Sequence, residues 1–172
     1  MPVIELPDGS SRTYDGVITP AVVAADIGPG LAKAALAAVV DGHEWDLTRP
    51  IDSDASLSLI TSRDKDAALQ LVRHDCAHIM AEAVLELYPE TQVTIGPAIE
   101  NGFYYDFFRE QPFSADDLAS IENRMHEIVD RDEDIIRGVW TRDEAVAFYH
   151  EKNEPFKIEL VEAIPENETV SY

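Results

Sequence analysis

The chain has 172 residues, 45% of them hydrophobic, so it is long enough for one medium or two small domains with buried cores. Its 34 acidic and 13 basic side chains give a formal net charge of −21, and residues 1–62 and 63–172 are both acidic. This charge excludes tight non-specific binding of nucleic acid by the chain alone, while brief contact with one RNA end stays open.

The sequence also shows no targeting segment and no pair of cysteines that could form a disulfide. No window is long and apolar enough to span a membrane, and the first ten residues lack the features of a secretory signal. We therefore expect a soluble, cytoplasmic protein. The single cysteine, Cys76, excludes an internal disulfide and an all-cysteine zinc site within this chain.

The first third of the chain predicts strands around a short helix. A β-hairpin comes first, because a Pro-Asp-Gly turn separates residues 3–6 from residues 10–14. A helix should follow over residues 21–27, with Thr19 as its N-cap, before a Gly-Pro-Gly sequence that cannot continue it.

The next residues are predicted to be extended. Residues 33–40 fit either structure, because alanine favours a helix while the Asp-Gly pair that follows is a hairpin turn signal. We interpret them as a strand that pairs with residues 44–47. Residues 57–60 form a last strand, and a polar linker follows.

A long helix is predicted from Asp66 to about Tyr88, where Pro89 stops it. At ~100° per residue, one face is purely apolar and the opposite face mixes leucines with histidines. The apolar face consists of Leu69, Val72, Cys76, Met80, Ala83 and Leu87. His74 and His78 lie on the mixed face, which could line a cleft.

Beyond this helix the pattern predicts a hairpin and then further helices and strands. Residues 92–99 and 103–108 flank Asn-Gly, the dipeptide that best fits a tight turn. The later elements are a helix from Ser114 to about Arg131, a strand over 134–140, a helix over 142–151 and a short apolar element over 156–164.

The H-x-x-x-H pair of His74 and His78 is the first candidate for chemistry. Two imidazoles one turn apart can share a metal ion, can divide general-base and orienting roles at one substrate atom, or can be structural. A metalloprotease would need a glutamate directly after His74, and Asp75 stands there. Cys76 lies on the other face and is interpreted as a small buried hydrophobe.

Two further candidates lie later in the chain. Tyr104 and Tyr105 alternate along the predicted hairpin and so point to opposite faces, where packing is the default interpretation. Lys157 is an isolated cation between two apolar residues. It is either a solvated surface lysine or a partly buried one with a lowered pKa, suited to proton transfer.

Four stretches carry a family resemblance: MPVIELPDGSSRTYD, DIGPGLAKAALA, RHDCAHIMAEAV and IGPAIENGFYYDF. They resemble the amino-terminal region of bacterial threonyl-tRNA synthetases over essentially the whole chain. Residues 1–62 resemble the TGS domain, a ubiquitin-like β-grasp fold, which also favours a strand at residues 33–40. Residues 63–172 resemble part of the α+β editing domain, which hydrolyses seryl-tRNA made in error for the threonine tRNA.

The resemblance implies an α+β fold in which the long H-x-x-x-H helix packs on a sheet. It implies that His74, His78 and Lys157 are catalytic and that Tyr105 shapes the amino-acid pocket. The family's D-x-C-R-G-P-H stretch, its class II catalytic core and its anticodon-binding domain are expected beyond this chain. Partial editing or a non-catalytic RNA- or protein-binding role are therefore both open for the chain alone.

The same resemblance predicts cofactors and partners. We expect no cofactor in this chain, whereas ATP, magnesium and a zinc ion belong to the synthetase's catalytic domain. A closed four-ligand zinc site is not expected from His74 and His78, to which Glu82 could at best add a third ligand. The expected partner is the 3′ end of threonine tRNA, with no membrane, and the synthetase is expected to be a homodimer through its catalytic domain.

Overall fold

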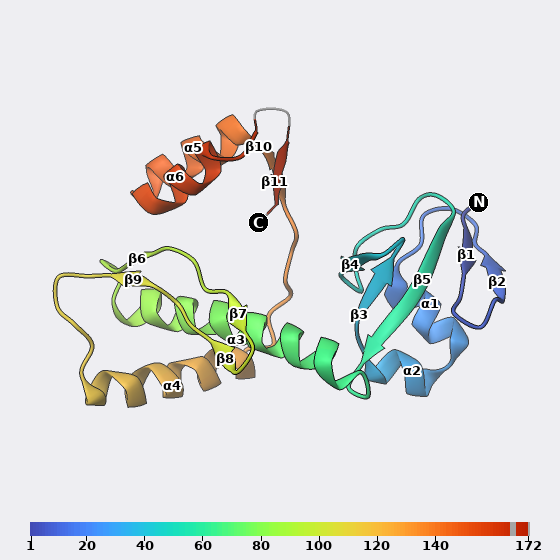
Figure 1. The fold of residues 1–172 in the computed structure, drawn as a ribbon, viewed down its shortest axis with the longest axis horizontal. Helices are drawn as coiled ribbons and strands as arrows, with labels where there is room; N and C mark the ends of the chain where they lie inside the picture. The colour runs from blue at the N-terminus through green and yellow to red at the C-terminus, as the bar shows by residue number, and fades with distance from the viewer. Residues whose placement is uncertain (166–167, 172) are drawn as a thin grey trace. The chain divides into compact units, whose positions relative to one another are not determined.

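The computed structural model describes residues 1–165 and 168–171. The chain divides into two compact units, Met1–Val72 and Arg73–Tyr172, and their boundary falls within helix α3 (Lys65–Leu87). Figure 1 shows the helices and strands of both units. The helices and sheets confirm the α+β fold.

The first unit is built on a five-stranded sheet with the order β2-β1-β5-β3-β4. The strands are β1 (Val3–Glu5), β2 (Ser11–Thr13), β3 (Ala35–Val40), β4 (His43–Trp45) and β5 (Ala55–Thr61). The central pair β1 and β5 is parallel, and the other neighbours are antiparallel. Both predicted hairpins and the predicted last strand are confirmed.

Local sequence explains these elements. Asp41 and Gly42 both have positive φ, as a two-residue hairpin turn between β3 and β4 requires. The Thr19 hydroxyl accepts a hydrogen bond from the backbone of α1 (Pro20–Ile27), which confirms the predicted cap. The core of this unit is a cluster of buried aliphatic side chains from the sheet and α1.

One part of the first unit differs from the prediction. Lys33 and Ala34, predicted to begin a strand, instead end a short second helix, α2 (Pro29–Ala34), and the strand starts at Ala35. The Gly-Pro-Gly sequence ends α1 but also starts α2, because proline is well suited to the first position of a helix. The Gly-Pro-Gly sequence therefore ends one helix and begins the next.

The second unit contains the pair of α3 and α4 (Ala115–Asp130). Ser114 caps α4 through a reciprocal capping box with Asp117, which confirms the predicted start. The buried cluster joins both helices and Phe107. Leu69 and Val72, predicted on the packed face of α3, are 46% and 51% exposed, because that face is covered only along later turns of the helix.

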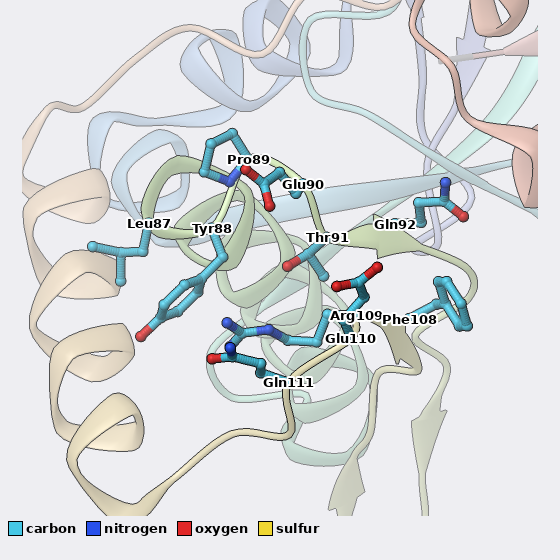
Figure 2. Close-up of a pocket in the computed structure, with 10 residues that line it drawn as sticks. All are labelled: Leu87, Tyr88, Pro89, Glu90, Thr91, Gln92, Phe108, Arg109, Glu110 and Gln111. Atoms are coloured by element: carbon cyan, nitrogen blue, oxygen red, sulfur yellow. The ribbon is translucent and has the colours of Figure 1, made fainter.

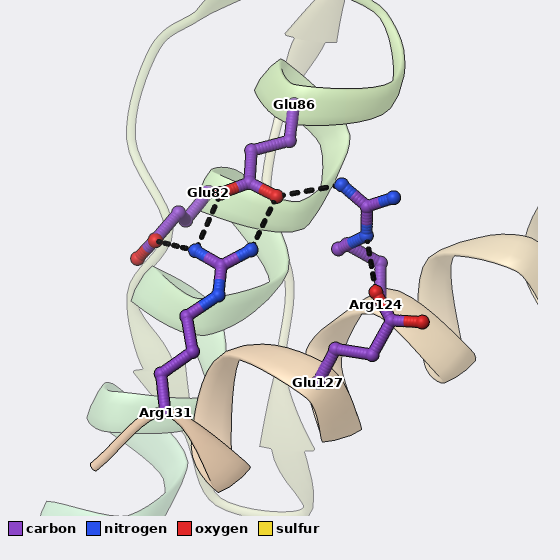
Figure 3. Close-up of polar contacts among 5 residues, drawn as sticks. All are labelled: Glu82, Glu86, Arg124, Glu127 and Arg131. Atoms are coloured by element: carbon purple, nitrogen blue, oxygen red, sulfur yellow. Dashed lines mark hydrogen bonds and ion pairs between the residues drawn. The ribbon is translucent and has the colours of Figure 1, made fainter. Parts of the chain in front are cut away.

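An ion-pair network also joins α3 to α4 (Figure 3). The Arg131 guanidinium donates to both carboxylate oxygens of Glu86 at 2.6 and 2.7 Å, and Arg124 donates to Glu86 at 2.7 Å. These arginines hold the pKa of Glu86 at about 2. The Nη1 atom of Arg131 also lies 3.5 Å from the Oε1 atom of Glu82. The Nε atom of Arg124 lies 2.8 Å from the Oε2 atom of Glu127.

The predicted hairpin after α3 is present as two short ladders. β6 (Gln92–Val93) pairs with β9 (Phe107–Phe108), and β7 (Ala98–Ile99) pairs with β8 (Gly102–Phe103). Between the ladders, the backbone N–H of Thr94 donates to the Asp106 carbonyl, and that of Asp106 donates to the Ile95 carbonyl. The hairpin is therefore continuous past Tyr105.

The remaining elements are helices α5 (Arg142–Glu151) and α6 (Pro155–Glu162) and the antiparallel strands β10 (Val139–Thr141) and β11 (Thr169–Ser171). The predicted strand over 134–140 is wrong for its first five residues, where Ile135 and Ile136 are 88% and 83% exposed. A strand forms only opposite β11, because an unpaired segment cannot satisfy a ladder of hydrogen bonds. No described helix meets the length and hydropathy that crossing a bilayer requires.

Candidate functional site

The two histidines of α3 are in direct contact. The Nε2 atoms of His74 and His78 lie 3.0 Å apart, and the rings meet edge to face with centroids 4.5 Å apart. One ring nitrogen must therefore donate the proton of this hydrogen bond while the other accepts it. Both residues are exposed on the helix, as the mixed face predicts.

The electrostatic surroundings favour a neutral His78. Partial desolvation lowers the pKa of the His78 imidazole, and the charges of His74 and Lys157 lower it further, against a smaller opposing effect of Asp75. Lys157 contributes to this lowering of the pKa although it lies 79 positions from His78 in the sequence.

Lys157 lies in the first turn of α6 and is partly buried. Its Nζ donates a hydrogen bond of 2.8 Å to the carbonyl of Thr94, at the end of β6. Burial lowers the pKa of the ammonium group, and Glu154 opposes this effect. Of the two interpretations of Lys157 from sequence, the structure favours the partly buried lysine.

Tyr105 packs tightly within its hairpin. Its ring stacks on Phe107, with centroids 5.0 Å apart, and covers Gly96. A Cβ atom built on Gly96 would lie 2.0 Å from the Cδ2 atom of Tyr105, so the ring occupies space that any other residue at position 96 would need. Burial raises the pKa of the Tyr105 phenol, and the charges of Glu154 and Tyr149 raise it further.

Of the four predicted residues, His74 and His78 are in direct contact. Among the described residues, Lys157 instead binds the Thr94 carbonyl, and Tyr105 packs on Phe107 and Gly96. Tyr104 is 45% exposed. The catalytic and binding roles of the four residues stay predictions.

Sequence reasoning missed Glu154. The carboxylate is partly buried, and its Oε2 atom is buried without a hydrogen-bond partner among the described residues. Its signal was its position three residues before Lys157, one helical turn away on the same face. That spacing is common on solvated helices, so only the fold distinguishes Glu154 from the other 33 acidic residues.

A metal ion shared by His74 and His78 was one interpretation of their spacing in the sequence. Within residues 1–165 and 168–171, no three His, Cys, Asp or Glu side chains are grouped so that they could hold a metal ion. Cys76 is a free, partly buried thiol. The expectation that the histidines form no closed zinc site stays a prediction.

A separate pocket of about 520 Å³ lies at the carboxyl-terminal end of α3 (Figure 2). Its lining comes from residues 87–92 and 108–111, which include none of the four predicted site residues. The Arg109 guanidinium lies over the rings of Tyr88 and Phe113, at 4.2 and 4.7 Å from their centroids. This pocket is therefore separate from the histidine pair.

Comparison with known proteins bears on both units. The family model described as "TGS domain" matches residues 3–61. Residues 3–61 are therefore similar to TGS domains. The match spans the five-stranded sheet of the first unit, from β1 to β5.

Relatives extend the similarity beyond the TGS domain. The chain is 61% identical over 171 residues to a threonine–tRNA ligase of Rhodospirillum rubrum, 58% to one of Acidiphilium cryptum and 55% to one of Gluconobacter oxydans. Each alignment covers 99% of this chain but only 26 or 27% of the relative. The chain thus spans about a quarter of their length, and its resemblance to the amino-terminal part of threonyl-tRNA synthetases is confirmed.

Proposed function

We propose that this chain is the amino-terminal proofreading part of a threonyl-tRNA synthetase, and that His74, His78, Tyr105 and Lys157 belong to a site that hydrolyses seryl-tRNA. The 61% identity to a threonine–tRNA ligase supports the family. The observation that carries the chemistry is the 3.0 Å contact between the Nε2 atoms of His74 and His78. The charge of Lys157, which lowers the pKa of His78, supports the inclusion of this lysine.

The chemical need for such a site follows from the two amino acids. Serine is threonine without one methyl group, and losing the packing of one methyl group discriminates by only ~1–3 kcal/mol, or roughly 10–200-fold. A second site that admits serine and excludes threonine increases the accuracy. The Tyr105 ring, packed on Gly96, offers a rigid wall for that exclusion.

The proposed reaction is ester hydrolysis by general-base catalysis. A neutral His78 accepts a proton from water while the water oxygen attacks the seryl carbonyl, and His74 orients the imidazole through their hydrogen bond. The Lys157 ammonium stabilises the negative charge that develops on the carbonyl oxygen. The bond to the ribose oxygen then breaks, and the proton passes to that leaving oxygen.

The test is deacylation of seryl-tRNA by the chain and by a full-length synthetase that contains it, with threonyl-tRNA as the specificity control. Loss of hydrolysis in His74→Ala and Lys157→Ala, with normal hydrolysis in His126→Ala, is the expected result. His126 is an exposed histidine of α4 and is not one of the four predicted site residues. Equal rates in all variants would reject this site.

The alternative is a non-catalytic module that binds RNA or protein. The compact first unit with its own core favours this role for the TGS domain, whose fold requires none of the site residues. Binding of tRNA without ester cleavage, in both the chain and the full-length protein, would favour the alternative. Under the proposal the tRNA 3′ end is the partner, the location is cytoplasmic, and ATP, magnesium, zinc and homodimer contacts belong to other parts of the synthetase.

A further inference from the structure

The pocket at the carboxyl-terminal end of α3 contains an arginine without an acidic partner. The guanidinium of Arg109 is held over the rings of Tyr88 and Phe113. No described residue forms an ion pair or a hydrogen bond with this guanidinium, and its Nη1 atom is buried without a partner. The arginines Arg124 and Arg131 of the same unit, in contrast, both bind glutamates. A lone arginine is unexpected in a chain with 34 acidic side chains.

The acidic residue of this aromatic cluster is already bound elsewhere. The Tyr88 hydroxyl donates to the Oδ1 atom of Asp117. The Oδ2 atom of Asp117 accepts hydrogen bonds of 2.7 Å from the backbone N–H and from the hydroxyl of Ser114, within the capping box that starts α4. The Asp117 carboxylate therefore caps a helix and does not pair with Arg109.

A second polar group of the same pocket has no partner. Pro89 follows the end of α3, and the backbone N–H of Thr91 donates to the Tyr88 carbonyl at 2.9 Å, so the chain turns there. Thr91 is only 3% exposed, and its Oγ1 atom is buried without a hydrogen-bond partner among the described residues. Thr91 and Arg109 both line the pocket (Figure 2). Buried polar groups of this kind are unfavourable unless a bound group supplies their hydrogen bonds.

These two groups define the chemistry of a ligand. A guanidinium has donors and no acceptor, and a hydroxyl can donate, so both fit the oxygens of an anion. The two oxygens of a carboxylate match the planar fork of the guanidinium. The exposed carboxylates of Glu90 and Glu110 also line the pocket and repel an anion with several charges. Leu87 and Phe108 add apolar surface to the lining.

We propose that this pocket binds a small organic monocarboxylate, with its carboxylate on Arg109 and Thr91 and its apolar part against Phe108. The pocket volume of about 520 Å³ lies within the range of small-molecule sites. The lining includes none of the four residues assigned to seryl-tRNA hydrolysis. The inference therefore goes beyond the proposed function and does not depend on it.

The test is a titration of the ¹⁵N-labelled chain with butyrate, at an ionic strength kept constant with sodium chloride. NMR shifts of the Thr91 amide and of the Arg109 Nε–H group measure the dissociation constant. Butyramide, which has nearly the same size and no charge, should not bind. Arg109→Gln should weaken butyrate binding by roughly tenfold to a hundredfold, the usual effect of losing hydrogen bonds to a charged group.

Thr91→Val gives a second and independent measurement, because it keeps the shape of the side chain and removes the hydroxyl. Butyrate binding should weaken by roughly twofold to tenfold. The melting temperature should stay the same or rise, since the Oγ1 atom has no hydrogen-bond partner among the described residues. A threonine with only a structural role would instead lower the melting temperature and leave the affinity unchanged, which would contradict the proposal.

The matched control is Arg137→Gln, which removes the same charge from an exposed position outside the pocket and should leave the affinity unchanged. The proposal would be overturned by shifts that do not saturate with butyrate, by unchanged affinity in Arg109→Gln, or by an equal loss in Arg137→Gln. Tighter binding of dimethyl phosphate than of butyrate would also overturn it, because the ligand would then be a phosphodiester of RNA. If Arg109→Gln fails to fold, Arg109→Lys replaces it and should also weaken binding, because lysine keeps the charge but lacks the planar fork.

Discussion

His74 is exposed on α3, and its ring contacts His78 without joining the buried cluster of that helix. In a full-length synthetase that contains this sequence, His74→Ala should slow seryl-tRNA hydrolysis by ~10²–10⁴-fold, the usual contribution of acid–base catalysis. Threonine charging should stay nearly unchanged, and seryl-tRNA should accumulate. Deacylation and charging assays on one preparation measure both rates.

A joint loss of charging and hydrolysis in His74→Ala would contradict this prediction. It would mean that the histidine supports the fold of the amino-terminal region and has no chemical role. Circular dichroism of the variant chain separates the two cases, because a structural histidine would lower the thermal midpoint as well.

Gly96 is predicted to tolerate no side chain. Gly96→Ala places a methyl group where the Tyr105 ring lies, and overpacking of this kind costs ~1–3 kcal/mol. Amide hydrogen exchange of the hairpin over residues 92–108 measures this loss of stability. Tyr105→Ala should remove most of the penalty when the two changes are combined.

The control for this substitution is Gly30→Ala in α2. A Cβ atom there meets nothing within 4 Å, and alanine is favoured over glycine in a helix by roughly 0.5–1 kcal/mol. Gly30→Ala should therefore be neutral or stabilising. If both substitutions were equally harmful, the close contact with Tyr105 would not be the cause.

The candidate site was only partly accessible from sequence. The contact of His74 with His78 follows from helical spacing, because residues four apart are neighbours on one face. Lys157 was a candidate as an isolated cation, but its catalytic role came from the family resemblance, and nothing local predicts that it binds the Thr94 carbonyl. Glu154 could not be found, because the burial of its Oε2 atom depends on packing between elements that are distant in sequence.

At the scale of elements, the pairing of α3 with α4 should depend on pH. Arg131, the C-cap residue of α4, and Arg124 within that helix lower the pKa of Glu86 to about 2, below its ordinary value of 4.5. A group whose pKa is lower in the folded state stabilises the fold above its unfolded pKa, and the contribution is lost as the pH falls from about 4.5 toward 2. Thermal unfolding of the second unit should therefore shift to lower temperature across this range.

Glu86→Gln should lower the melting temperature at neutral pH and flatten the dependence between pH 4.5 and 2. Glu122→Gln, an exposed glutamate of α4, is the control and should leave the curve as it is. If the melting temperatures of Glu86→Gln and the unchanged chain varied with pH in parallel, the ion pairs of Glu86 would not stabilise the packing of α3 on α4.

Elements with local end signals were predictable. Ser114 and Thr141 each start a helix through a capping box, with Asp117 and Glu144 completing it, and both starts were predicted within one residue. α2 was missed because alanine-rich residues after Pro29 fit two structures equally well. The strand at β10 was predicted to begin five residues too early and β11 was missed, because each strand is defined by a partner about thirty residues away.

At the scale of the whole molecule, the net charge of −21 governs binding of RNA. A protein that neutralises six to ten phosphates loses ~10³–10⁵ in affinity between 50 and 200 mM salt, because it releases counterions. The affinity of this chain for a tRNA acceptor mimic should fall by less than about tenfold over the same range of salt concentration. Fluorescence anisotropy at both salt concentrations measures the change, and a steep loss would reveal a local basic surface that the overall charge conceals.

The segment over residues 132–138 connects α4 to β10 without secondary structure, and its two isoleucines are almost fully exposed. A protease must bind an extended backbone, and this segment already offers one. Trypsin should therefore cut first after Arg137, before it attacks the lysines and arginines of the helices. The two products should elute together under native conditions, because the hydrogen bond from Lys157 to Thr94 and the packing of α6 on β6 still join them after the chain is broken.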